Sequence, residues 1–246
     1  MRGRVTNKTG CIICGTQLLY LDTPRSMECY LCGVSIESYA QCIEGHFVCD
    51  SCHSLPAMEY IEQFCIHNES ADPVEMSNEI MRNSSIKMHG PEHHFLVPAV
   101  LVSAYYNSLG EPDKKQNKLA VAKTRAGQIL GGFCGFYGDC GAAVGTGIFM
   151  SLILNATPLS KNEWRLCNLM TSRSLNSIAV HGGPRCCKRN TYLAIGEAVQ
   201  FLSDNFRIQL PGRKNIRCDF SSLNKECLLE ACPFYADGHP TGTRGD

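Results

Sequence analysis

Residues 131–149 read GGFCGFYGDCGAAVGTGIF, and this glycine-rich stretch decides how the chain folds. Glycine at this density weakens a helix or strand, so we expect either close packing of one element on another or close approach of a ligand. An apolar helical run, 142–154, follows, which places Cys140 at or near a helix N-terminus with Asp139 as its N-cap. The free N–H groups and the helix dipole favour a thiolate there. Cys140 is therefore predicted to be a chemical rather than a structural cysteine.

Length and charge limit the possible functions of the chain. Its 246 residues, 44% of them hydrophobic, suffice for one medium domain and a small one. A formal net charge of zero gives no general attraction to nucleic acid or to an anionic membrane. The apolar runs are too short or too rich in glycine to span a bilayer. The N-terminal MRGRVTNKTG carries no apolar signal core, so we expect a cytoplasmic protein.

Sixteen cysteines then point to metal or redox chemistry rather than to disulfides. The first group contains regular C-x2-C pairs, and such a pair presents two zinc ligands from one tight turn. Eight ligands make two zinc sites, and four protein ligands per ion leave no position for water, which indicates structural zinc. The predicted zinc ligands are Cys11, Cys14, Cys29, Cys32, Cys42, His46, Cys49 and Cys52.

Two pairings of these ligands fit the spacing. A sequential pairing joins the first four ligands and leaves the last four, from Cys42 to Cys52, for the second ion. An interleaved pairing joins Cys29 and Cys32 with the Cys49 pair, as in the first six ligands of RING-type cross-brace fingers, although the final pair of that pattern is absent. We favour the interleaved pairing because four ligands within eleven residues are crowded. His53 is a possible substitute for His46.

The remainder of the chain has helical periodicity. Almost everything from 92 to 205 reads as helix, without the alternation typical of strands. An earlier helix is predicted over 73–81, with Asp72 as N-cap and Pro73 at the first position. The predicted fold is mainly α: a small zinc-finger domain over 1–66, an all-helical bundle over 67–210 and a cysteine-containing tail over 211–246. The boundary between the first two is expected within 66–88.

A second chemical motif is GGPRCCKR, residues 182–189. Cys186 and Cys187 stand in the first turn of a helix among three cations, so at least one is predicted to be acidic and either nucleophilic or metal-binding. Neighbouring side chains on a helix point about 100° apart. One of the two is therefore expected to face Cys140, and the other to have a different role.

These helix starts, at 92, 140 and 186, are predicted to converge on one pocket. Thiolates with imidazole suit zinc, an iron–sulfur cluster or thiol–disulfide exchange, and clustered helix N-termini also suit a small anionic ligand. Catalytic roles are assigned to Cys140, Cys186, Cys187, His93 and His94. The same pocket is expected to bind its cofactor through Cys134, Cys140, Cys186, Cys187 and His181.

The tail adds Cys218, Cys227 and Cys232, the last followed by Pro233. A closing cysteine before proline is typical of bacterial ferredoxin clusters. Three tail cysteines and one from the helical part would complete a four-iron cluster, with structural cysteines or a third zinc as alternatives.

The motifs also resemble known families. Cys140-Gly141-Ala142, Gly145 and the Cys186–Cys187 pair resemble the C-GCAxxG-C-C proteins, a small helical family thought to be redox-active. Two differences stand out: His93-His94 occupies the place of that family's early cysteine, and the closing cysteines are adjacent. The chain is still more similar to an uncharacterised prokaryotic family with HGPEHH, GFCGxYGxCGAAxG and GGPRCCKR. Some of its relatives are fused to S-adenosylmethionine-dependent methyltransferase domains.

Two functions remain open from the sequence. The first is a cysteine-based redox or metal–sulfur protein; as an enzyme it would be an oxidoreductase or an accessory to sulfur or methyl transfer. It would work with a redox partner protein. The alternative is a zinc-stabilised, non-catalytic module that binds a small anionic ligand or a methyltransferase partner.

Overall fold

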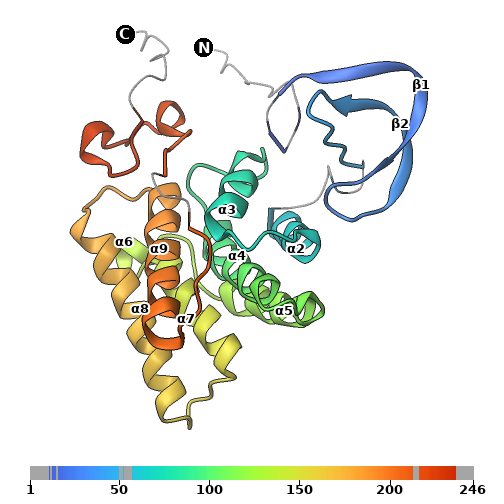
Figure 1. Ribbon diagram of the computed structural model, residues 1–246. Helices are drawn as coiled ribbons and strands as arrows, with labels where there is room; N and C mark the ends of the chain where they lie inside the picture. The colour runs from blue at the N-terminus through green and yellow to red at the C-terminus, as the bar shows by residue number, and fades with distance from the viewer. Residues whose placement is uncertain are drawn as a thin grey trace, which may run out of the picture.

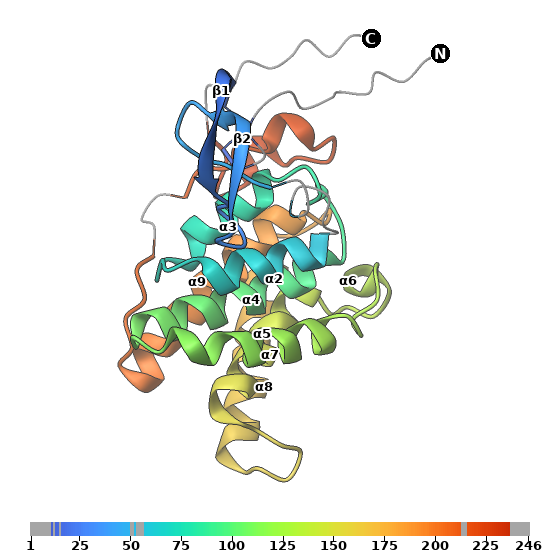
Figure 2. The ribbon, with the colours of Figure 1, turned by 90° about the vertical axis from the view of Figure 1, so that its right-hand side faces the viewer.

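The computed structural model describes residues 11, 13, 14, 16–49, 52, 57–212 and 216–236. Over these residues the fold is mainly α, as predicted: a hairpin is followed by a helical bundle and a tail with short 3-10 turns. Figures 1 and 2 place the hairpin and the tail at the same end of the bundle. The division of the chain into 1–66, 67–210 and 211–246 stays a prediction.

The N-terminal part contains a hairpin that the sequence analysis did not predict. Strand β1 (Leu18–Glu28) pairs antiparallel with β2 (Ser35–Cys42), with an irregular register between Tyr20 and Arg25. Among the described side chains of the hairpin, Leu19 and Ile36 are exposed, and Cys42 at its end is buried. A two-stranded ribbon of this kind is marginal alone in water. We therefore expect the cysteines at its ends to stabilise it.

Two helices lead from the hairpin into the bundle. Helix α2 (Ala57–His67) packs on the later helices through buried Tyr60 and Phe64. Helix α3 (Pro73–Arg82) begins as predicted, because the Asp72 carboxylate accepts the amides of Val74 at 2.9 Å and Glu75 at 3.0 Å.

Helix α4 (Glu92–Ser108) is the centre of the bundle. It is buried on almost every side and contacts α2, α3, α5, α7 and α9. A helix that is apolar all round belongs in a core rather than at a surface. Around it lie η1 (Pro112–Lys114), α5 (Lys115–Ala126), the single turn α6 (Phe133–Phe136), α7 (Gly141–Leu154), α8 (Asn162–Val180) and α9 (Cys187–Phe206).

The glycines of the opening stretch serve the contact between α4 and α7. A Cβ atom on Gly141 would stand 2.2 Å from Cδ2 of His94, and one on Gly145 would stand 2.8 Å from Cδ of Pro98. Both distances are too short for non-bonded carbon atoms. Close helix packing, one of the two expected reasons for the glycines, is therefore confirmed at these two positions.

The tail folds over the starts of α4 and α9. It contains two 3-10 turns, η2 (Ser221–Leu223) and η3 (Leu229–Ala231), and closes with a hydrogen bond from the Cys218 amide to the Phe234 carbonyl at 2.7 Å. An ion pair joins Arg82 of α3 to Asp219. His89, just before α4, bonds through Nε2 to Oδ1 of Asn224 at 3.1 Å. These contacts fix the tail cysteines relative to the bundle.

Among the described helices, none combines the length and apolar character needed to cross a membrane. This agrees with the sequence, whose apolar runs are short.

Candidate metal centres

The N-terminal ligands form two compact groups. Within each group all ligand atoms lie within 4.8 Å of one another: Cys11, Cys14, Cys42 and His46 form one group, and Cys29, Cys32, Cys49 and Cys52 the other. The Sγ atoms of Cys14 and Cys42 are 3.4 Å apart, and those of Cys32 and Cys49 are 3.8 Å apart. A tetrahedral zinc with Zn–S bonds of about 2.3 Å sets its sulfurs about 3.8 Å apart. Both groups could therefore hold a metal ion such as zinc.

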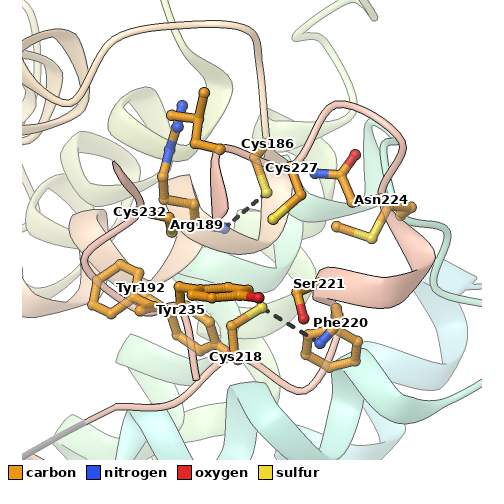
Figure 3. Close-up of a pocket in the computed structure, with 13 residues that line it drawn as sticks. Cys186, Arg189, Tyr192, Cys218, Phe220, Ser221, Asn224, Cys227, Cys232 and Tyr235 are labelled. Atoms are coloured by element: carbon orange, nitrogen blue, oxygen red, sulfur yellow. Dashed lines mark hydrogen bonds between the residues drawn. The ribbon is translucent and has the colours of Figure 1, made fainter. Parts of the chain in front are cut away.

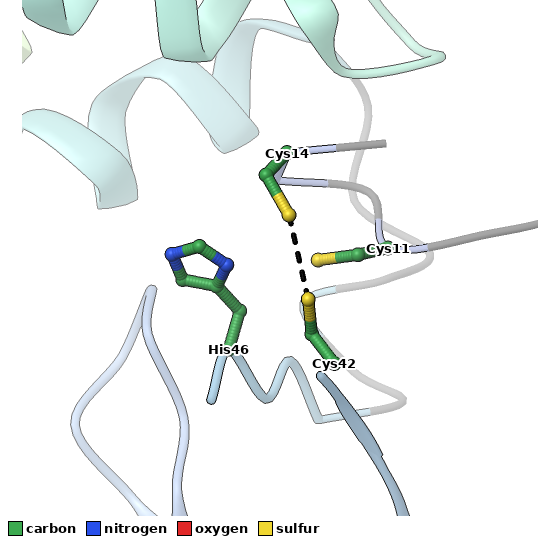
Figure 4. A group of neighbouring side chains, drawn as sticks. All are labelled: Cys11, Cys14, Cys42 and His46. Atoms are coloured by element: carbon green, nitrogen blue, oxygen red, sulfur yellow. Dashed lines mark hydrogen bonds between the residues drawn. The ribbon is translucent and has the colours of Figure 1, made fainter. Parts of the chain in front are cut away.

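This grouping is the interleaved pairing that was favoured from the sequence. Figure 4 shows the three cysteines and His46 of the first group turned toward a common point. Nδ1 of His46 is buried without a hydrogen-bond partner, as expected of a nitrogen that a metal ion would occupy. Its proposed substitute, His53, lies outside the described residues.

Two sulfurs in these groups, those of Cys29 and Cys42, have a lowered pKa, whereas burial raises the pKa of Cys11 to about 11 and also raises that of Cys32 and Cys52. At Cys42 burial acts to raise the pKa, but hydrogen bonds from Thr16 and the Glu44 amide help to outweigh it and lower the pKa to about 6. At Cys29 backbone amides, that of Cys49 foremost, likewise outweigh burial and lower the pKa to about 7. Hydrogen bonds to the charged form favour it, and thiolate is the form that binds metal.

A second set of cysteines lines an enclosed pocket between α9 and the tail (Figure 3). Cys186, the N-cap of α9, faces the three tail cysteines, Cys218, Cys227 and Cys232. The sequence analysis left open which cysteine of the helical part would join the tail, and the structure brings Cys186 there. In the described part of the chain, only the two N-terminal groups bring three or more ligand atoms within 4.8 Å, so these four sulfurs are more widely spaced.

The pocket sulfurs are hydrogen-bonded in the same manner as the N-terminal ligands. Cys218 accepts the amide of Phe220 at 3.4 Å, and Cys227 accepts that of Leu229 at 3.4 Å. A hydrogen bond from the amide two residues later in the chain also occurs in the N-terminal groups, where the sulfur of Cys11 accepts the amide of Ile13 at 3.4 Å. An accepted backbone N–H favours the thiolate form, although burial outweighs it at Cys218 and raises the pKa of that thiol to about 11. The donor set and its hydrogen bonds therefore fit a metal centre.

Cys186 and Cys187 face different neighbours, as predicted for adjacent helix residues. After burial, the charge of Cys232 is among the causes that raise the pKa of Cys186, whereas the charges of Cys140 and Cys134 are among those that raise the pKa of Cys187. Cys140, the N-cap of α7, accepts Nδ2 of Asn190 at 3.4 Å. The starts of α7 and α9 thus meet at this contact, and the ring of His94 brings the start of α4 to Gly141. The three helix starts lie close together, but their convergence on one pocket stays a prediction, and in the described residues the sulfurs do not share one centre.

Three details of the prediction are wrong. Asp139 is not the cap of α7; Cys140 occupies that position, and Oδ1 of Asp139 is buried without a partner. Cys140 is not an acidic thiol, because burial raises its pKa more than the amides of α7 and Asn190 lower it. Cys186 and Cys187 are not acidic either: burial raises the pKa of Cys186, and raises that of Cys187 to about 11. Desolvation outweighs the helix dipole and the nearby cations.

The predicted histidines have separate environments. His93 is fully buried, with Nδ1 3.3 Å from Oγ1 of Thr191 and Nε2 3.1 Å from the Lys87 carbonyl, which leaves no ring nitrogen for a metal. His94 bonds through Nδ1 to the Ile129 carbonyl at 3.1 Å. His181 bonds to the Ser177 carbonyl of its own helix at 2.7 Å and lines neither cysteine pocket. Catalytic or cofactor roles for these residues stay predictions.

His93 predicts a pH dependence of stability. Burial, and then the charge of Lys188, lowers its pKa to about 3 in the folded state. The unfolded chain therefore binds one more proton between pH 6.5 and 3, so stability falls with decreasing pH by about 1.4 kcal/mol per unit below pH 6.5. His93→Gln should flatten this slope in urea unfolding at pH 7.5 and 5.5. His181→Gln, at a partly exposed ring, is the control, and parallel curves for His93→Gln and wild type would contradict the prediction.

Sequence reasoning also missed Arg189 and Asn190. Both are buried, and both line a second cavity that holds Cys134 and Cys140. Arg189 was counted only as one of the cations that flank Cys186 and Cys187. No sequence signal indicated that its guanidinium is buried.

Comparison with known proteins adds one match. Residues 61–235 match the model of a family described as "Family of unknown function (DUF5714)", a stretch that contains the glycine-rich segment, the Cys186–Cys187 pair and the tail cysteines. This agrees with the predicted similarity to an uncharacterised family, while the resemblance to the C-GCAxxG-C-C proteins stays a prediction. Neither the curated proteins nor the solved structures contain a significant match to the chain.

Proposed function

Since the chain belongs to DUF5714, a family of unknown function, we propose from its geometry that it is a cysteine-based redox protein with three metal centres. Two structural zinc ions occupy the N-terminal groups. An iron–sulfur cluster occupies the pocket between α9 and the tail. The observation that carries this proposal is the enclosure of four cysteines, from α9 and the tail, around one buried space.

The zinc assignment follows from the chemistry of the N-terminal ligands. Three thiolates with one imidazole, and four thiolates, are ligand sets typical of structural zinc. Each set fills a tetrahedron with protein atoms and leaves no coordination position for a substrate. These ions therefore hold the hairpin in place and take no part in chemistry.

Sulfur spacing favours a cluster over a third zinc in the tail pocket. The N-terminal sulfurs already stand at zinc spacing, whereas no three of the four pocket sulfurs lie within 4.8 Å of one another. Cluster ligands stand farther apart than zinc ligands, because several iron and sulfide atoms lie between them. The space between the lining side chains is about 20 Å³, so the tail is expected to stand farther from α9 when a cluster is bound.

The positive charge in the first turn of α9 also suits an iron–sulfur cluster, because a cluster with thiolate ligands carries a net negative charge. Lys188 and Arg189 are both buried, and the Arg189 guanidinium acts to lower the pKa of Cys186, although burial raises it overall. Lys188 places Nζ 4.8 Å from the centre of the Phe220 ring, beside the pocket. Two buried cations offset much of the cost of burying a negatively charged centre. When bound, such a cluster stores and releases single electrons.

Metal analysis of protein purified without oxygen tests this assignment. We expect about four iron and four sulfide per chain, with visible absorption that dithionite bleaches, beside about two zinc. Cys227→Ser should lose the iron and keep the zinc. Cys167→Ser, in α8 and away from both N-terminal groups and the tail pocket, is the matched control. A third zinc in place of iron after reconstitution would contradict the redox role and leave a structural centre.

A further inference from the structure

A second cavity lies on the other side of Arg189 from the tail. Its volume is about 340 Å³, within the range of small-molecule sites. It is lined by residues of α6, the end of α8, the loop between α8 and α9, and the starts of α7 and α9. Glycines at 135, 138, 182 and 183 line it, and a Cβ on any of them would meet no atom within 4 Å. The walls therefore leave open space beside the cavity.

The charged side chains that line this cavity are all positive. Arg185 and Arg189 are among its lining residues, and no aspartate or glutamate is. The nearest acidic residue in sequence, Asp139, lies between two lining residues but does not line the cavity, and burial raises its pKa. Uncompensated guanidinium groups around an open space are the electrostatic signature of an anion site.

Arg189 is a fixed donor. Its side chain is only 3% exposed, and no carboxylate in the described residues lies within ion-pair distance of it. Nη2 donates to the carbonyls of Gly182 at 2.6 Å and Pro184 at 3.1 Å, and Nε donates to Oδ1 of Asn190 at 3.4 Å. Its other terminal nitrogen, Nη1, has no acceptor within the described chain. Carbonyl oxygens thus fix the orientation of this buried cation, and one of its N–H donor groups has no acceptor. Such a group is preorganised to bind an anionic ligand.

Two cysteines line the cavity. The sulfur of Cys140 accepts a hydrogen bond from Nδ2 of Asn190 at 3.4 Å. Cys134, in α6, lines the same space. A molecule whose anionic end meets the two arginines would therefore extend across a surface with two sulfur atoms.

We propose that this cavity binds a small organic anion. Its carboxylate or phosphate lies between Arg185 and Arg189, and the rest of the molecule lies against the Cys140 thiol. This site contains none of the four pocket cysteines; Arg189 lines both spaces, whereas Arg185 lines this cavity and not the tail pocket.

Two alkylating reagents of nearly equal size test the proposal on the full-length, metal-loaded protein. Iodoacetate carries the carboxylate that the site should recognise, and iodoacetamide is its neutral counterpart. In both reactions the sulfur bonds to the CH₂ group, iodide leaves and the thiol proton passes to solvent. Rates are read at the Cys140 and Cys134 peptides by mass spectrometry and divided by the rates for free cysteine.

We expect iodoacetate to be favoured about tenfold at Cys140, with saturation at high concentration, since one charge-assisted contact is worth about a factor of ten or more. Arg185→Gln should remove this preference, while Arg165→Gln, at least ten residues away along α8 from the cavity wall, should keep it. Asp139→Asn, which removes a nearby negative charge, should strengthen it. Acetate or inorganic phosphate should suppress the reaction, and the stronger competitor identifies the ligand class.

Equal normalised rates for the two reagents, or a preference that survives Arg185→Gln, would overturn the proposal. Where neither cysteine reacts, equilibrium dialysis with labelled acetate and phosphate decides instead: saturable binding that Arg185→Gln abolishes supports the site, and its absence refutes it. Iron and zinc content, measured on the same samples, shows separately whether the metal centres are intact. Failure of the anion site is thus distinguishable from failure of the redox assignment.

Discussion

Replacing Cys29 with serine should release both N-terminal metal ions rather than one. The segment from Cys42 to Cys52 supplies ligands to both groups: Cys42 and His46 belong to one, and Cys49 and Cys52 to the other. The amide of Tyr30 also bonds to the Phe47 carbonyl at 2.8 Å, between the two ligand sets. Structural zinc contributes about 10–16 kcal/mol of folding free energy, as much as a whole domain's stability. Loss of one ion should therefore unfold the segment that holds the other.

Zinc content by elemental analysis and backbone NMR of the hairpin measure this effect. Cys65→Ala is the matched control, because Cys65 is fully buried in α2 and belongs to neither group. We expect the control to keep about two zinc ions per chain and Cys29→Ser to keep fewer than about one. A Cys29→Ser protein with one tightly held zinc and an ordered hairpin would indicate two independent sites.

Gly141→Ala should destabilise the helical bundle by about 3 kcal/mol. The new methyl group would stand 2.2 Å from Cδ2 and 2.5 Å from Nε2 of His94. The ring of His94 is fixed by its bond to the Ile129 carbonyl at 3.1 Å, so it cannot turn away without loss of that bond. Overpacking in a well-packed core costs about 1–3 kcal/mol, and the broken hydrogen bond adds to this.

Gly196→Ala is the matched control for this substitution. Gly196 lies in α9, and a Cβ there meets no atom within 4 Å, so alanine should stabilise the protein by up to about 1 kcal/mol. Denaturant unfolding of both variants gives the comparison. His94→Ala removes the obstructing ring, so Gly141→Ala in that background should cost much less. An equal cost in both backgrounds would mean that the strain lies elsewhere.

The sequence predicted those features that depend on spacing along one segment. The C-x2-C pairs and the crowding between Cys42 and Cys52 indicated the interleaved metal groups, and helix geometry indicated that Cys186 and Cys187 face apart. Glycine density indicated the close approach of α7 to another element, although not that this element is α4. In each case the sequence pattern and the residues whose structure it predicted belong to the same segment of the chain.

The features that depend on distant burial were missed. The acidity predicted for Cys140 rested on the free N–H groups and the helix dipole, but packing of α4, α7 and α9 removes water from the thiol, and burial raises its pKa instead. The hairpin escaped prediction because its sequence lacks a regular alternation of apolar residues and lies between metal ligands. The choice of Cys186 as partner of the tail depends on contacts across the fold, such as the His89–Asn224 hydrogen bond, that no local pattern encodes.

The place of the four pocket cysteines along the chain has a consequence for biosynthesis. The last N-terminal ligand, Cys52, emerges early from the ribosome, whereas the pocket is complete only after Cys232 has been made. At typical elongation rates these events are separated by on the order of ten seconds or more. If the proposed centres are present, zinc can be captured during translation, while iron and sulfide must be delivered to a nearly finished chain. On that proposal, a cell short of iron would accumulate a chain that holds zinc and lacks its cluster.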